Sequence, residues 1–133
     1  MLGWIMLNPS TADAEQDDAT IRVCVRRAKA MQFGAIVVVN LFALRSTSPK
    51  ALYDAADPVG PDNFEHIVNV AKACPIIVCA WGTHGSHCGM GDTIRTRLSQ
   101  FYPGKSFALR INADGSPGHP LYIPAAAELI PFA

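Results

Sequence analysis

The sequence predicts a single α/β domain, spanning residues 1–133, around a short and mostly parallel sheet of four strands. Two observations predict this fold class. Four short apolar runs alternate along the chain with three stretches in which apolar residues recur at helical spacing. The runs are apolar throughout, as expected of strands that are covered on both faces. A chain of 133 residues, half of them hydrophobic, is also long enough to bury one core.

Each expected strand is bounded by a residue that interrupts its apolar run. The first run stops before Pro9, because proline cannot donate a hydrogen bond to a neighbouring strand. The third begins after Cys74-Pro75, since the residue before a proline disfavours the helical conformation. The expected strands are residues 2–7, 35–39, 76–80 and 106–111.

Apolar spacing and stop signals define three expected helices. The first begins near Asp18, where acidic side chains suit the positive end of the helix dipole, and ends before Gly34. The second begins near Pro61 and ends before the third strand, and the third runs from about Asp92 to Gln100. Turn-forming residues gather elsewhere and predict irregular segments at residues 41–61, 82–91 and 112–133.

The charge balance limits the classes of partner. Eleven basic and eleven acidic residues leave no formal net charge, which argues against a protein that binds long duplex DNA without sequence preference. No apolar run approaches the ~20 residues of a membrane span, and no secretory leader is visible. We therefore expect a cytoplasmic protein with no membrane partner. The first apolar run begins almost at Met1, which suggests upstream residues that complete an edge of the sheet.

Cysteine and histidine spacing does not predict a metal site. The four cysteines match no zinc-binding pattern, so we expect four free thiols. His84, His87 and Cys88 lie close together, but three ligands without an evident fourth fall short of a zinc tetrahedron. We expect no metal and no cofactor. Asp13 is a candidate catalytic residue in an acidic stretch that could hold Mg²⁺, activate water or form a solvated start to the first helix.

A candidate ligand site is expected where the strands end. Ligands of open parallel α/β sheets bind beyond the carboxyl ends of the strands. The first apolar run ends at Asn8, the second at Asn40 and the third at Trp81-Gly82. His119 follows the fourth run after a turn-rich segment that is long enough to return to the same edge. The sequence therefore predicts that these residues converge on one cleft.

The side chains at the expected strand ends suit a planar polar ligand such as a nucleobase. An asparagine amide offers both a donor and an acceptor, and a histidine can donate a hydrogen bond or a proton near neutral pH. Trp81 could stack on such a ligand or form a wall of its pocket. Each residue also has a structural alternative: Asn8 and Asn40 as loop caps, Trp81 as core, and His119 as a loop histidine.

Four segments carry a resemblance to a known family: residues 5–13 (IMLNPSTAD), 38–43 (VVNLFA), 80–82 (AWG) and 119–122 (HPLY). They closely resemble a bacterial and phage family known as domain of unknown function 1643. The resemblance spans nearly the whole chain. Its name carries no established activity.

The layout is also similar to the uracil-DNA glycosylase superfamily, whose members have a three-layer αβα fold around a short parallel sheet. Asn8-Pro9-Ser10 stands where that superfamily often has Asn-Pro-Gly, and His119-Pro120 stands where it has His-Pro-Ser. The resemblance implies catalytic roles. Asn8 would orient a water, and His119 would stabilise charge that develops on the departing base.

The same resemblance implies a set of substrate-binding residues. An asparagine that reads the base edge often falls where Asn40 stands, and a Trp-Gly pair similar to residues 81–82 ends a strand. Together with the two residues that follow Asn8, the expected substrate-binding set is Asn40, Trp81, Gly82, Pro9 and Ser10.

Three function classes follow. The first is a protein directed to a nucleobase, a nucleotide or single-stranded nucleic acid, acting as a glycosylase-like hydrolase. The second is a non-catalytic nucleotide or nucleic-acid binding module, which would carry a basic rim in place of a tight catalytic constellation. The third is an interaction protein with a degenerate pocket, which would expose an apolar patch.

Overall fold

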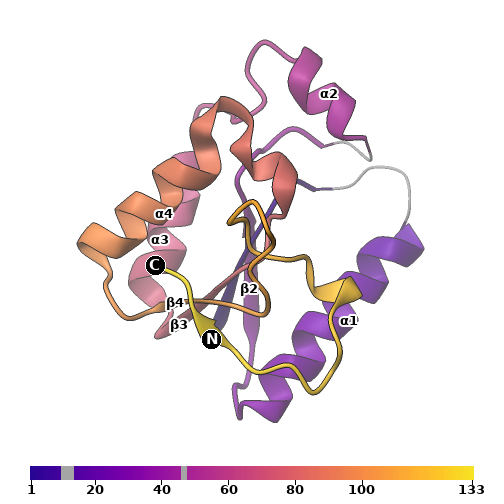
Figure 1. The fold of residues 1–133 in the computed structure, drawn as a ribbon, viewed down its shortest axis with the longest axis vertical. Helices are drawn as coiled ribbons and strands as arrows, with labels where there is room; N and C mark the ends of the chain where they lie inside the picture. The colour runs from indigo at the N-terminus through magenta and orange to yellow at the C-terminus, as the bar shows by residue number, and fades with distance from the viewer. Residues whose placement is uncertain (10–13, 46–47) are drawn as a thin grey trace.

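A five-stranded sheet forms the centre of the protein in a computed structural model, which describes residues 1–9, 14–45 and 48–133 (Figure 1). The strand order is β2-β1-β3-β4-β5. The first four strands run parallel, and the last pairs antiparallel with its neighbour. The strands are β1 (Leu2–Met6), β2 (Ile36–Asn40), β3 (Ile76–Cys79), β4 (Ser106–Ala108) and β5 (Ile130–Pro131).

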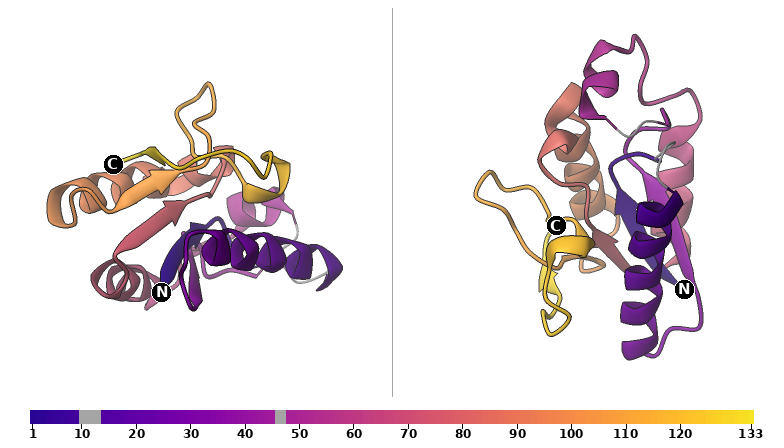
Figure 2. Two further views of the ribbon diagram at one scale, coloured as in Figure 1. Left: turned by 90° about the horizontal axis from the view of Figure 1, so that it is seen from below. Right: turned by 90° about the vertical axis from the view of Figure 1, so that its right-hand side faces the viewer.

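Helices cover both faces of this sheet (Figures 1 and 2). Helix α1 packs on one face, together with residues 120–129, and helices α3 and α4 pack on the other. Helix α2 lies beyond the sheet, at the end toward which the parallel strands point. The helices are α1 (Ala14–Ala30), α2 (Pro49–Asp54), α3 (Asn63–Ala73) and α4 (Met90–Phe101), with 3₁₀ helices η1 (Thr83–Gly89) and η2 (Pro120–Tyr122).

The expected α/β fold class is confirmed, but the predicted number of strands is wrong. The sheet has five strands, not four, because residues 130–131 add an antiparallel strand to β4. This strand could not be predicted from the sequence, since it is two residues long and contains a proline. Pro131 is compatible with pairing here because it lies on an edge strand, where a missing N–H can be tolerated.

Several boundaries also differ from the expectation: α1, for example, begins at Ala14 rather than near Asp18. Two of the differences have identifiable physical reasons. Strand β4 ends at Ala108 rather than at residue 111, because the chain then forms a turn in which the Asn112 N–H donates to the Ser116 carbonyl at 2.8 Å. Helix α2 occupies part of the segment 41–61, which was expected to be irregular. The residues that start this helix are local in the sequence. Ser48 caps the helix by accepting from the Lys50 N–H, and Pro49 occupies its first turn.

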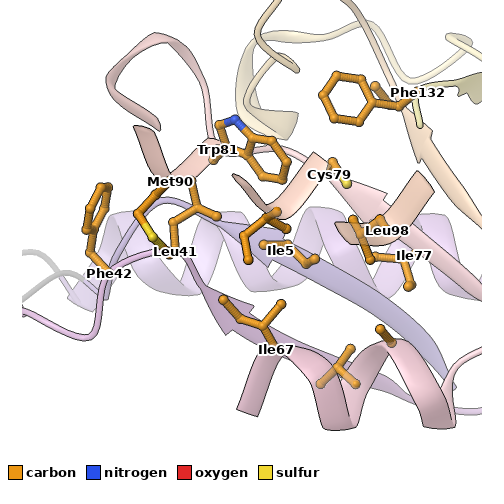
Figure 3. Close-up of a cluster of buried hydrophobic side chains, with 14 of the residues drawn as sticks. Ile5, Leu41, Phe42, Ile67, Ile77, Cys79, Trp81, Met90, Leu98 and Phe132 are labelled. Atoms are coloured by element: carbon orange, nitrogen blue, oxygen red, sulfur yellow. The ribbon is translucent and has the colours of Figure 1, made fainter. Parts of the chain in front are cut away.

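The core is divided by the sheet into two clusters. On the α1 face, Leu2 and Trp4 pack against Cys24 and Ala28 of α1. On the other face, Ile5 and its neighbours pack against α3 and α4, and Figure 3 shows this larger cluster extending to Trp81 and Phe132. Alternate residues of β1 therefore serve opposite layers, as the two-residue repeat of a strand requires. None of the described helices is long and apolar enough to cross a membrane.

The expectation of four free thiols is confirmed, and three of the four are buried. Burial raises the pKa of the Cys24 thiol to about 12 and also raises the pKa values of Cys74 and Cys79. We predict that a chromogenic thiol reagent at neutral pH labels Cys88 alone in the native protein and all four cysteines after denaturation without reductant. Fast labelling of more than one native thiol would contradict the packing described here.

A glycine under the Trp81 indole provides a second test of the core. A Cβ atom at Gly85 would overlap Cδ1 of Trp81 and lie 3.0 Å from Cδ1 of Leu41, so Gly85→Ala should lower the free energy of unfolding by roughly 1–3 kcal/mol. Gly34→Ala is the matched control, because nothing lies within 4 Å of a Cβ atom there. Urea denaturation measures both variants. Equal effects would show that Gly85 is not sterically required.

Candidate functional site

The carboxyl ends of the parallel strands β2, β1 and β3 meet at one end of the sheet, here called its carboxyl edge. In the strand register Met6 lies opposite Asn40, and Ile5 lies opposite Cys79. The pairing continues past the strands, since the Leu41 N–H donates to the Met6 carbonyl and the Ala80 N–H donates to the Ile5 carbonyl, both at 2.9 Å. The predicted site residues that follow these strands therefore start from a common edge.

The alternation of side chains nevertheless separates Asn40 from Trp81. In β2, Ile36 and Val38 pack with the α1-side cluster, so Asn40, two residues on, takes the same face. Trp81 belongs to the opposite cluster, where it is only 4% exposed and its ring lies 5.5 Å from that of Phe132 (Figure 3). This burial supports the core alternative for Trp81.

The Asn40 side chain lies at the end of β2. The side chain is half-buried, and among the described residues it has no hydrogen-bond partner. Its backbone carbonyl is occupied: Nδ2 of the buried Asn63 donates to it at 2.7 Å and to the Leu41 carbonyl at 2.9 Å. Asn63 was not singled out in the sequence, and it fixes the end of β2.

Asn8 is partly engaged in fixing the loop after β1. Its Nδ2 donates to the Leu44 carbonyl at 3.2 Å and to the Pro9 carbonyl at 3.3 Å, and the side chain is half-buried. These bonds tie the segment after β1 to the segment after β2, which supports the loop-cap alternative for Asn8. Pro9 is half-buried beside it, whereas Ser10 and Asp13 lie outside the described residues.

His119 returns to the same edge through a hydrogen bond made by Gly82. Gly82 adopts a φ of 74°, which suits glycine, and its N–H donates to the Pro117 carbonyl at 2.8 Å. The segment just before His119 is thereby held against the end of β3. His119 itself caps η2, because its Nδ1 accepts from the Leu121 N–H at 3.2 Å.

The protonation state of His119 follows from these surroundings. Burial lowers the pKa of His119 below its usual value of 6.5, so the ring is neutral at physiological pH. Because Nδ1 acts as the acceptor for Leu121, the hydrogen of the neutral ring resides on Nε2. The protein therefore sets the tautomer of His119 through the fold of η2.

An aromatic group beside the strand ends was not predicted from the sequence. The Tyr53 hydroxyl of α2 lies 3.1 Å from Nδ1 of His84 in η1, and the Tyr53 ring lies 4.4 Å from that of His87. Tyr53 is 48% exposed. The sequence contains Tyr53, His84 and His87, but it does not show that they meet, because their contact depends on the position of α2. The capping signal of α2 was the clue to that helix in the sequence. In the described part of the chain, no group of three His, Cys, Asp or Glu residues could hold a metal ion.

A cavity of about 640 Å³ lies on the α1 face of the sheet, near the strand ends but not at them. Trp4, two residues before the end of β1, and Val78, one residue before the end of β3, form its floor. Pro120 and Leu121, which follow His119, contribute one wall. Asn40 and this cavity therefore share one face of the sheet, while Trp81 lies on the other.

Comparison with known proteins gives one match. A family model described as "Protein of unknown function (DUF1643)" matches residues 1–121. No curated protein and no solved structure matches the chain.

The lowered pKa of His119 makes stability depend on pH. The folded-state pKa lies below the unfolded one, so the stabilising contribution is present above about pH 6.5 and is lost as the pH falls below that value. We predict that wild-type protein loses more stability than His119→Asn between about pH 7.5 and about pH 5.5, because asparagine keeps a capping oxygen and does not titrate.

Urea denaturation of both proteins at the two pH values measures this difference. The remaining histidines are common to wild type and variant, so their titration cancels. Equal losses of stability would mean that His119 titrates as a solvated imidazole and does not cap η2 as a neutral acceptor.

Proposed function

The chain belongs to the family described as protein of unknown function DUF1643, and we propose that it binds a nucleobase or nucleotide at the carboxyl ends of β1 and β2. In this proposal the Asn40 side chain reads the edge of the base. The ligand lies on the α1 face of the sheet, between the ends of these strands and His119.

The observation that carries this proposal is the state of the Asn40 amide. A half-buried amide without a partner in the described part of the chain is costly unless a ligand or water satisfies it. Asn63 makes the contrast clear, since its amide is buried and donates two hydrogen bonds to backbone carbonyls. One asparagine supports the fold, and the other offers a donor and an acceptor to a planar polar partner.

A glycosylase-like reaction is the catalytic form of the same proposal. Helices on both faces of a mostly parallel sheet support this form, as do Asn8-Pro9 after the first strand and His119-Pro120 near the end of the chain. His119 would donate from Nε2 to a departing base, and Asn8 would orient the attacking water. The sequence departs from the superfamily motifs at Leu7, in place of glycine, and at Leu121, in place of serine.

One panel of ligands distinguishes a binding protein from a hydrolase. Thermal shift with nucleobases, nucleosides, nucleotides and short single-stranded oligonucleotides identifies what binds the folded state, because such a ligand raises the melting temperature. Chromatography of the same mixtures detects release of free base. Binding without release supports a non-catalytic binding module, and release that is lost in His119→Ala supports hydrolysis.

Three asparagine-to-alanine variants test the role of Asn40. Asn40→Ala should weaken binding of the best ligand by ~1–3 kcal/mol and leave the melting temperature nearly unchanged, because only the ligand loses a partner. Asn63→Ala should lower the free energy of unfolding by ~1–3 kcal/mol, since two carbonyls lose their donor. Asn69→Ala, at an exposed position of α3, should change neither quantity.

Titration calorimetry and thermal melts of the three variants give both readouts. A large loss of stability in Asn40→Ala would assign Asn40 to the fold and remove the basis of the proposal. Unchanged ligand affinity in Asn40→Ala would place the ligand elsewhere.

A further inference from the structure

The cavity on the α1 face has a covering segment of its own. Residues 120–129, here called the strap, run along α1 and form one wall of the cavity, while α1 and the sheet form the others (Figures 1 and 2). Its floor and walls are mainly apolar, with Trp4 and Val78 from the sheet, Val23 from α1 and Leu129 from the strap. A volume of about 640 Å³ is in the range of small-molecule sites.

Arg27 donates two hydrogen bonds to the strap. Nη1 of Arg27 donates to the Ala127 carbonyl at 3.0 Å, and Nη2 donates to the Pro124 carbonyl at 2.9 Å. Both acceptors are neutral backbone groups, so they engage the guanidinium without neutralising its charge. Arg27 lines the cavity and is half-buried, and the cavity wall therefore contains a partly desolvated positive charge.

No anion in the described part of the chain balances this charge. Burial, together with repulsion from Arg26, lowers the pKa of Arg27. Glu128 also lines the cavity, but it is exposed and forms no ion pair with either arginine in the described structure. A half-buried cation beside a second cation, without a carboxylate, favours an anionic ligand.

The unsatisfied hydrogen-bonding groups point to the same kind of ligand. Nε1 of Trp4 and Nε of Arg27 are buried and have no hydrogen-bond partner among the described residues. Both residues line the cavity, and both atoms are donors. Among the side chains that line the cavity, no buried acceptor is left without a partner in the described part of the chain. A complementary ligand would therefore supply acceptors to an apolar cavity.

We propose that this cavity binds a small amphipathic carboxylate, with its apolar body against Trp4 and Val78 and its carboxylate at Arg27. A carboxylate matches the planar guanidinium and brings the single negative charge that the cavity lacks. Because the orphaned donors are closed to solvent, the carboxylate reaches them when the strap shifts and it replaces the Ala127 and Pro124 carbonyls on Arg27. The strap then acts as a lid, and the site shares no residue with the proposed base site at Asn40.

Four probes with the same eight-carbon chain test the charge requirement. Octanoate should raise the melting temperature saturably and bind in calorimetry with one site per chain. Octanol should bind at least roughly tenfold more weakly, because it lacks the charge that pairs with Arg27. Octyltrimethylammonium should not bind. Octyl phosphate tests the head group, and equal or tighter binding than octanoate would overturn the assignment to a carboxylate.

Three variants locate the bound octanoate. Arg27→Gln should bring the affinities for octanoate and octanol to within roughly twofold of each other. This holds even if loss of the hydrogen bonds from Arg27 to the strap, here called the Arg27 latch, lowers stability. Lys29→Gln removes a charge from the same helical turn outside the cavity lining, so it should preserve the preference for octanoate. Val23→Phe fills the cavity from α1 and should abolish octanoate binding while the protein remains folded.

The outcomes that overturn the proposal are equally specific. They are equal affinity of octanoate and octanol in wild type, an unchanged preference in Arg27→Gln, or unchanged octanoate binding in Val23→Phe. Absence of saturable binding by octanoate also rejects it. Nucleoside binding is measured on the same variants and should be unaffected, so this proposal and the proposed function fail separately.

Discussion

The rest of the structure depends on the parallel pairing of β1 on both of its sides. Its register with β2 and β3 fixes where three strands end and which side chains face each layer. Gly3 makes this central position compatible with close helix packing, since a Cβ atom there would lie 3.0 Å from Cγ1 of Val70 and 3.2 Å from Sγ of Cys74. A shift of one residue would exchange the two faces, move Trp4 toward α3 and separate Asn40 from the α1 side.

The two layers that β1 separates have different characters. The layer containing α3 and α4 is filled by large side chains, and it encloses Trp81 between η1 and Phe132. The α1 layer is less complete, because one helix and an extended segment cover an area that two helices cover on the other face. Both ligand-binding proposals concern this second layer. A fold with unequal layers can keep one face for stability and leave space for ligands on the other.

The place of Asn40 at the end of β2 could be predicted from the sequence, because it depends on local signals. Asn40 ends a continuous apolar run, and counting alternate positions from Ile36 gives its face. The burial of Trp81 could not be predicted in this way. It depends on Gly85 and Gly91, which let the backbone after β3 approach the indole, and on Phe132 from the far end of the chain. The Arg27 latch joins residues 100 positions apart, and no local pattern marks such a contact.

The two edges of the sheet differ in their capacity to accept another strand. At one edge β5 is only two residues long and contains Pro131, which lacks an N–H and so interrupts any ladder that would form there. At the other edge β2 is five residues long, is paired on one side and has the apolar, β-branched sequence Ile-Val-Val-Val before Asn40. Strand addition is therefore disfavoured at β5, whereas the open side of β2 presents the longer and more apolar edge to another strand.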